Sequence, residues 1–252
     1  MIEIFILSLI QGITEFLPIS SSSHLIIISE YLKFNNQNLE IDISLHIGSF
    51  LAVLVFFRND LINFVKNKKI FLLILTSSFP IMIVGFFLTK TNVINALQTL
   101  EVIGWTTIIF GILLYISDKF KQNKFIKNNL GLSDAIFIGI VHATSLVPGV
   151  SRSGVAITAG RLLGYSRVDS ARISFLLSIP TLFAVSIYGL FEIYSTSVFE
   201  INNFNIMSVF LSFFFSYITI KYFLIFLKKF SLTIFVIYRI ILGIIIISYV
   251  YQ

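Results

Sequence analysis

Six long apolar runs constrain this chain more than any other feature of its sequence. They lie at Asp42–Phe57, Ile70–Leu88, Glu101–Ser117, Arg172–Phe191, Ile206–Leu227 and Thr233–Tyr251. Each approaches the ~20 residues that an α-helix needs to cross about 30 Å of hydrocarbon. Hydrophobic residues make up 57% of the chain, and a soluble core of this size is too small to bury them. The sequence therefore predicts an all-α polytopic membrane protein, with residues 1–252 forming a single integral membrane domain.

Two further apolar stretches are interrupted by proline. Ile2–Leu17 ends at Pro18, and Leu132–Val147 ends at Pro148. The arms that follow are too short to span the bilayer: Leu25–Ile28 and Gly154–Gly164. Broken backbone at membrane depth is tolerated only where it is buried in protein or lines a watery cavity. We therefore expect two re-entrant helical hairpins, which we call the first broken segment (residues 2–28) and the second broken segment (residues 132–164).

The two broken segments resemble each other at an offset of 130 residues. Gly12–Pro18 aligns with His142–Pro148, Ser21 then falls on Ser151, and three apolar runs follow each segment. An odd number of crossings in each half inverts the second half relative to the first. In that arrangement polar sites form near the bilayer midplane, at the repeat interface. The sequence predicts such an inverted twofold repeat, with halves at approximately 1–128 and 129–252, each a re-entrant hairpin plus three transmembrane helices.

Positive residues are concentrated in alternate loops. These loops hold Arg58, Lys66, Lys68, Lys69, Lys119, Lys121, Lys124, Lys127, Arg167, Lys228 and Lys229. The opposite loops hold only Lys33 and Lys90, and the Val198–Asn205 loop holds no positive residue. Because cytoplasmic loops are enriched in Lys and Arg, the first set is predicted to be cytoplasmic. The mouth of the first broken segment then faces outward, the second segment enters from the cytoplasm, and their tips can meet inside the membrane.

Charge and cysteine content exclude other classes of function. The net charge of +6 is explained by loop orientation, and the basic, aromatic-bearing soluble face of a nucleic-acid-binding protein is missing. The absence of cysteine removes disulfides, thiolate metal sites and thiol nucleophiles. The first apolar run lacks a basic leader and a small-residue cleavage site, so we expect no cleavable signal peptide.

Glu15 and Arg152 are the ionisable residues whose positions most strongly indicate a function. Ionisable groups inside a membrane segment are costly and point to function by default, and these two lie at the tips of elements predicted to converge. The alternative is a structural ion pair that locks the two halves together. Gln11 lies four residues before Glu15, so both share a helix face. Their oxygen atoms suit Mg²⁺ or Ca²⁺ held jointly with a phosphate.

Ser21 and His24 follow the first proline, three residues apart. A hydroxyl beside an imidazole is the minimum for an activated nucleophile and its base. The neighbouring serines Ser20, Ser22 and Ser23 are equally explained as helix-packing or capping residues. His46 and His142 are interpreted as core histidines, and His46 is also able to line a cavity. Lys221 and Arg239 are interpreted as charges at span ends that snorkel to the membrane surface.

The second broken segment has the features of a phosphate-binding site. A new helix is predicted to begin at Ser151-Arg152-Ser153, just after Pro148 and Gly149. Helix N-termini present free N–H groups to anions, and an arginine fork matches two phosphate oxygens at once. One segment thus offers metal ligands, nucleophile and base, and the other offers anion donors. Together they indicate phosphoryl transfer, in which positioning and charge neutralisation supply most of the catalysis.

At these residues the sequence resembles the undecaprenyl-diphosphate phosphatases, a family known for conferring bacitracin resistance. The family's Glu/Gln-x-x-x-Glu motif matches Gln11 to Glu15 and continues into Phe16–His24. Its Pro-Gly-x-Ser-Arg-Ser-x-x-Thr motif matches Pro148–Ser153, with Ala156 at the closing threonine and Thr158 two positions later. The resemblance covers essentially the whole chain in length, span count and motif spacing.

The resemblance implies hydrolysis of undecaprenyl diphosphate to the monophosphate, which recycles the lipid carrier for peptidoglycan synthesis. It implies an enzyme of the bacterial inner membrane. The oxygen atoms of Gln11 and Glu15 predict a divalent cation, and the loop charges predict an active site open to the outer face. The implied catalytic set is Glu15, Ser21, His24 and Arg152, with substrate contacts at Gln11, Ser151, Ser153 and Thr158. The sequence does not decide whether Ser21, His24 or water attacks the phosphate. It does not fix the oligomeric state either, and a homo-oligomer is compatible with it. The alternative function is an ion-coupled transporter or flippase of an anionic lipid.

Overall fold

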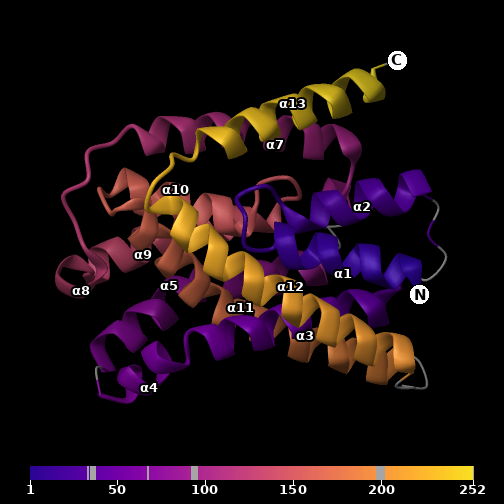
Figure 1. Ribbon diagram of the computed structural model, residues 1–252, viewed down its shortest axis with the longest axis horizontal. Helices are drawn as coiled ribbons and strands as arrows, with labels where there is room; N and C mark the ends of the chain where they lie inside the picture. Colours follow the sequence, from indigo (N-terminus) through magenta and orange to yellow (C-terminus); the bar gives the residue numbers. More distant parts are fainter. Residues whose placement is uncertain (33, 35–37, 67, 92–95, 197–201, 252) are drawn as a thin grey trace.

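The computed structural model describes residues 1–32, 34, 38–66, 68–91, 96–196 and 202–251. Its elements are α1 Ile2–Thr14, α2 Ser21–Leu32, α3 Leu39–Phe56, α4 Arg58–Lys66, α5 Lys68–Lys90, α7 Leu100–Asp118, α8 Ile126–Asn129, α9 Leu132–Ala143, the 3₁₀ turn η1 Thr144–Leu146, α10 Arg152–Leu162, α11 Arg167–Thr196, α12 Asn203–Leu227 and α13 Thr233–Val250 (Figure 1). Among the described residues, six helices are long and apolar enough to cross a membrane: α3, α5, α7, α11, α12 and α13. The six predicted spans and the all-α class are confirmed.

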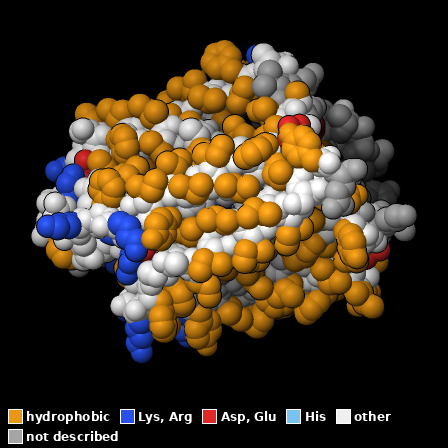
Figure 2. All heavy atoms as spheres, turned by 90° about the horizontal axis from the view of Figure 1, so that it is seen from above, with side chains coloured by type: hydrophobic (Ala, Val, Ile, Leu, Met, Phe, Trp, Pro, Cys, Tyr) orange, Lys and Arg blue, Asp and Glu red, His pale blue; other side chains and the backbone are white. Residues whose placement is uncertain are grey.

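The surface of these spans is apolar, and the basic residues gather at one end. Phe86, Ile109 and Phe210 are exposed on three different spans, as expected of side chains that face lipid. Figure 2 shows a broad hydrophobic surface with lysines and arginines collected at the end where α4 and α8 lie. The predicted common side of these basic loops is therefore confirmed. Two loop features fall outside the described residues, namely Lys33 and the first half of the Val198–Asn205 loop.

Ion pairs join the loops at this basic end. The Arg167 guanidinium at the start of α11 donates to both carboxylate oxygens of Asp118 at the end of α7, at 2.6 and 2.9 Å. Arg172 on α11 donates to Asp60 on α4 at 2.8 Å. These contacts hold the ends of three elements together and fix which loops share a side.

Both broken segments are interrupted by a turn with unusual backbone. Ser20, before α2, has φ +73°, and Ser151, before α10, has φ +71°. Non-glycine residues rarely adopt this conformation. The second break carries one extra residue, with Gly149 at φ +88°. The offset of 130 at the prolines therefore becomes 131 at these serines, so that Ser21 follows Ser20 as Arg152 follows Ser151. The sequence alignment had instead placed Ser21 on Ser151.

The first arm of each broken segment packs against a spanning helix from the other half of the chain. Helix α1 is the first arm of the first broken segment and packs along α12. Helix α9 is the first arm of the second broken segment and packs along α5. A glycine allows each close approach. A Cβ on Gly12 would lie 2.5 Å from Phe215 Cβ, and a Cβ on Gly139 would lie 2.6 Å from the Ser77 carbonyl oxygen. This packing brings both breaks into the interior.

Candidate active site

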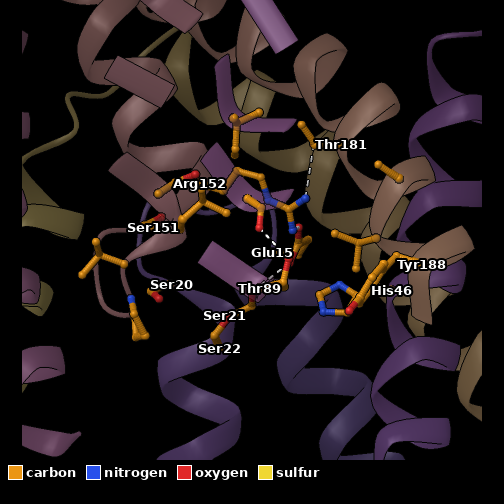
Figure 3. A pocket seen from close by; sticks show the side chains of 18 of the residues that line it. Glu15, Ser20, Ser21, Ser22, His46, Thr89, Ser151, Arg152, Thr181 and Tyr188 are labelled. Carbon is orange, nitrogen blue, oxygen red and sulfur yellow. Dashed lines mark hydrogen bonds and ion pairs between the residues drawn. The ribbon is translucent and has the colours of Figure 1, made fainter. Parts of the chain in front are cut away.

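A cavity of about 450 Å³ lies between the two breaks. Its polar wall contains Glu15, Ser20, Ser21, Ser22, His46, Ser151, Arg152 and Thr181, several of which converge in Figure 3. Its apolar wall contains Ile26, Ile81, Met82, Phe86, Leu146, Val147 and Val185. Phe86 and Val185 are also exposed on the outer surface of α5 and α11. The cavity therefore has a polar end inside the protein and an apolar side that reaches lipid-facing helices.

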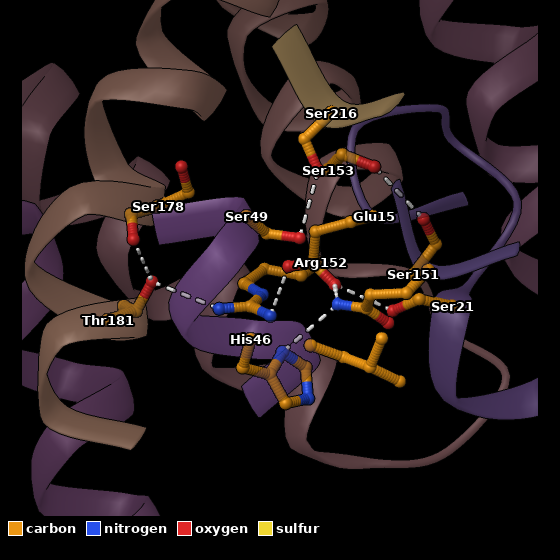
Figure 4. A network of polar contacts seen from close by, with 12 residues as sticks. Glu15, Ser21, His46, Ser49, Ser151, Arg152, Ser153, Ser178, Thr181 and Ser216 are labelled. Atoms are coloured by element: carbon orange, nitrogen blue, oxygen red, sulfur yellow. Dashed lines mark hydrogen bonds and ion pairs between the residues drawn. The ribbon is translucent and has the colours of Figure 1, made fainter. Parts of the chain in front are cut away.

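Glu15 and Arg152 form an ion pair at the polar end (Figure 4). The Arg152 Nη2 donates to Glu15 Oε1, and its Nη1 donates to the Thr181 hydroxyl on α11 at 3.3 Å. The predicted convergence of the two segments is confirmed. A purely structural ion pair would form the same contact, so the contact alone does not distinguish a functional role from a structural one.

The other oxygen of the Glu15 carboxylate accepts two further hydrogen bonds. The Ser21 hydroxyl donates to Glu15 Oε2 at 2.7 Å, and the Gln11 amide nitrogen donates to the same atom at 3.1 Å. That amide nitrogen also lies 3.1 Å from His46 Nδ1. A purely structural ion pair needs neither a hydroxyl nor an adjoining cavity. A carboxylate that accepts a hydrogen bond from a hydroxyl has the geometry that a general base requires.

His24 does not pair with Ser21, and this prediction is wrong. Its Nδ1 lies 2.6 Å from the Ser20 carbonyl oxygen, and its Nε2 lies 2.6 Å from the Tyr238 hydroxyl. The imidazole is thus held against the turn and against α13, while the Ser21 hydroxyl faces the other way toward Glu15. The carboxylate beside Ser21 belongs to Glu15, and a catalytic role for His24 stays a prediction.

In the second broken segment, only part of the predicted phosphate set lines the cavity. Ser151 caps α10 by accepting from the Gly154 N–H at 3.1 Å, which confirms the predicted helix start. Ser153 donates instead to the Leu17 carbonyl at 2.7 Å, and Thr158 donates to the Gly154 carbonyl at 2.9 Å. Because backbone carbonyls hold both hydroxyls, the structure does not support direct substrate contact by Ser153 or Thr158.

Three residues lie closer to the site than the sequence had indicated. His46 lines the cavity, which the sequence analysis had left open beside a core role. Thr181 lies inside a predicted span, directly after Pro180, and was not predicted to belong to the site. Arg239 is fully buried, so its interpretation as a snorkelling residue is wrong. Its place six residues inside the last run was the signal that could have shown this. Lys221 is exposed, as predicted.

The fold and the site together define a multi-span membrane protein whose broken helices enclose a carboxylate, a hydroxyl and a guanidinium. Residues 4–245 match the family described as bacitracin resistance protein BacA. The chain belongs to this family.

Relatives match along their full length and carry one name. An undecaprenyl-diphosphatase of Pelagibacter ubique is 47% identical over 252 residues, which cover 100% of this chain and 98% of the relative. Those of Jannaschia sp. and Alcanivorax borkumensis are 37% and 39% identical, covering 98% and 96% of both chains. The resemblance predicted from the two motifs is therefore confirmed.

Proposed function

We propose that this protein hydrolyses undecaprenyl diphosphate to undecaprenyl phosphate and inorganic phosphate. The observation that carries the proposal is the Glu15–Arg152 pair, with Ser21 bonded to it, at the polar end of a cavity with an apolar side. A diphosphate headgroup fits the polar end, and an isoprenoid chain fits the apolar side. The full-length relatives are named for this activity. Release of the monophosphate recycles the lipid carrier for peptidoglycan synthesis and underlies bacitracin resistance.

Each site residue has a role that follows from its contacts. Arg152 binds the terminal phosphate with its fork and neutralises charge that develops as the anhydride bond breaks. Ser151 and the free N–H groups at the start of α10 bind the same phosphate. Glu15 accepts a proton from the attacking group, which is the Ser21 hydroxyl or a water molecule beside it. His24 would have to leave its contacts with Ser20 and Tyr238 before it could take part.

The donor set fits a divalent cation. Glu15 supplies a carboxylate at the cavity, and the Gln11 Oε1 atom is buried with no hydrogen-bond partner among the described residues. Those residues contain no cluster of three or more acidic or imidazole groups. Mg²⁺ is commonly held by one or two protein oxygens together with substrate phosphates. Glu15 and Gln11 would therefore hold Mg²⁺ or Ca²⁺, which supplies neutralisation of phosphate charge.

The inverted repeat belongs to the same proposal. Its support is the reciprocal packing of α1 on α12 and of α9 on α5, together with a serine of positive φ at the same point of each break. Both broken segments would then be re-entrant hairpins that meet at the midplane. Their breaks are in direct contact, because Ser153 donates to the Leu17 carbonyl.

An outward-facing site in the bacterial inner membrane is supported by the position of the cavity. Its lining includes Thr89 and Gln98, which flank the C-terminal end of α5. The basic loop before Lys68 lies at the other end of that helix. If basic loops are cytoplasmic, the cavity opens toward the outer face.

The test is phosphate release by the purified protein in detergent, with undecaprenyl diphosphate as substrate and no ion gradient. We expect multiple turnovers that stop when a chelator is added. A transporter or flippase of an anionic lipid would release no phosphate under these conditions, and that result would refute the proposal.

A further inference from the structure

Arg239 is a buried charge that the proposed mechanism does not use. It lies within the spanning helix α13 and has no exposed surface. It lines neither described cavity, and none of the salt bridges among the described residues includes it. Ionisable side chains inside membrane spans are costly and point to a function by default.

The Arg239 guanidinium donates to three backbone carbonyls from three different segments. Its Nη1 donates to the Pro18 carbonyl at 3.3 Å, its Nη2 to the Gly149 carbonyl at 2.9 Å, and its Nε to the Thr107 carbonyl at 3.1 Å. Pro18 belongs to the first break and Gly149 to the second. A carbonyl at a helix break lacks a partner within its own helix, and at membrane depth little water replaces it. One side chain therefore satisfies both breaks at once.

These carbonyls lie close to the site along the chain. Each stands three residues before a side chain of the site, Ser21 in the first break and Arg152 in the second. In each segment a serine of positive φ, Ser20 or Ser151, lies between the residue whose carbonyl Arg239 contacts and the residue whose side chain belongs to the site. Such backbone conformations persist only where the surroundings hold them. Through these carbonyls, Arg239 contacts the backbone that leads to Ser21 in one segment and to Arg152 in the other.

The surrounding helices leave room for this guanidinium. A Cβ on Gly111 of α7 would lie 3.2 Å from Arg239 Cβ, and a Cβ on Gly154 of α10 would lie 3.0 Å from its Nη1. The preceding residue, Tyr238, contacts His24 Nε2 at 2.6 Å. The middle of α13 therefore supports the first broken segment at two points and the second at one.

We propose that Arg239 is a positioning residue that holds Ser21 and Arg152 at the separation that a diphosphate requires. It acts through the Pro18 and Gly149 carbonyls and does not touch the substrate. This inference rests on the proposed phosphatase function. A lysine at this position keeps the charge but has a single nitrogen, so Arg239→Lys breaks the link between the two segments.

The kinetic test compares Arg239→Lys with wild type per folded molecule, using phosphate release from undecaprenyl diphosphate. Small misplacements of reacting groups cost up to about a hundredfold in rate. We expect kcat to fall about tenfold to a hundredfold, with KM changed less than about threefold because Arg152 still binds phosphate. Arg172→Lys, the same change at the basic end of α11, is the control and should keep wild-type kcat. A merely stabilising role predicts a lower melting temperature with wild-type kcat, which overturns the proposal.

A second variant keeps the test decisive if Arg239→Lys does not fold. Gly111→Ala retains the guanidinium but forces the Arg239 stem to move by a few tenths of an ångström. We expect a severalfold loss of kcat at unchanged KM, and a wild-type kcat in this variant would then refute the proposal.

A distance measurement tests the link independently of activity. The chain has no cysteine, so nitroxide labels at Ser22→Cys and Thr144→Cys report the separation of the two breaks by electron paramagnetic resonance. The distance distribution should broaden in Arg239→Lys and stay narrow in Arg172→Lys. An unchanged distribution overturns the positioning role. Failure of wild-type protein to release phosphate would instead refute the proposed function, with this measurement still deciding the role of Arg239.

Discussion

Replacing Arg152 by lysine separates the geometry of the phosphate site from its charge. In the free protein the guanidinium uses Nη2 for Glu15 and Nη1 for Thr181. Lysine keeps the positive charge and the ion pair with Glu15, but its single ammonium cannot also present a planar fork to two phosphate oxygens. Loss of about 3–4 kcal/mol of transition-state stabilisation lowers the rate by two to three orders of magnitude.

The assay is phosphate release in detergent, with kcat/KM measured at several concentrations of Mg²⁺ or Ca²⁺. The loss in Arg152→Lys should persist at every concentration, because the proposed cation ligands Gln11 and Glu15 lie on the other segment. The melting temperature should stay near that of wild type, since the ion pair survives. Ser22→Ala, a change in the cavity wall without an assigned role, should cost little. Near-wild-type activity in Arg152→Lys would show that this position supplies only diffuse charge, and the phosphate assignment of α10 would be abandoned.

Three further predictions follow from the same geometry. Glu15→Gln should abolish turnover with little change in melting temperature, whereas a structural ion pair predicts a loss of about 3–5 kcal/mol in the free energy of unfolding, seen as a large fall in melting temperature. Ser21→Ala should lower kcat at least tenfold if the hydroxyl attacks, and much less if water does. Single cysteines at Thr91 and Lys68, at opposite ends of α5, should label from opposite sides of intact cells. Labelling of Lys68 from outside would contradict the outward-facing site.

The spans and breaks were predictable because their causes are local. A run of about 20 apolar residues has few alternatives to a spanning helix, and a proline followed by a run of polar residues interrupts such a helix. Pro80 and Pro180, which no such run follows, lie inside continuous helices. The same reasoning placed Glu15 and Arg152 at the two breaks. Their contact also followed, because both charges would otherwise be buried without a partner.

The orientation of side chains was not predictable from spacing. Ser21 and His24 are three residues apart, which favours a shared face on a regular helix. The positive φ at Ser20 changes how the first turn begins, and the partners that hold His24 come partly from Tyr238, more than 200 residues away. Arg239 was misread for a related reason. Its three acceptors are backbone carbonyls, which every residue has, so no residue type marks them in the sequence.

Charge balance reconciles the ion pair with catalysis. In the free protein, Glu15 and Arg152 neutralise each other at the polar end of the cavity, so the empty site needs no further charge. A diphosphate headgroup brings several negative charges and competes with Glu15 for the Arg152 fork. Binding would leave an excess of negative charge unless a divalent cation enters with the substrate. The pair therefore balances charge in the empty site, and the proposed cation would be needed only when the phosphates bind. It follows that cation affinity should be weak without the diphosphate and tight with it. Calorimetry with Mg²⁺, in the presence and absence of a non-hydrolysable isoprenyl diphosphate analogue, measures this difference. Equal cation affinity in the two states would refute the charge-balance argument.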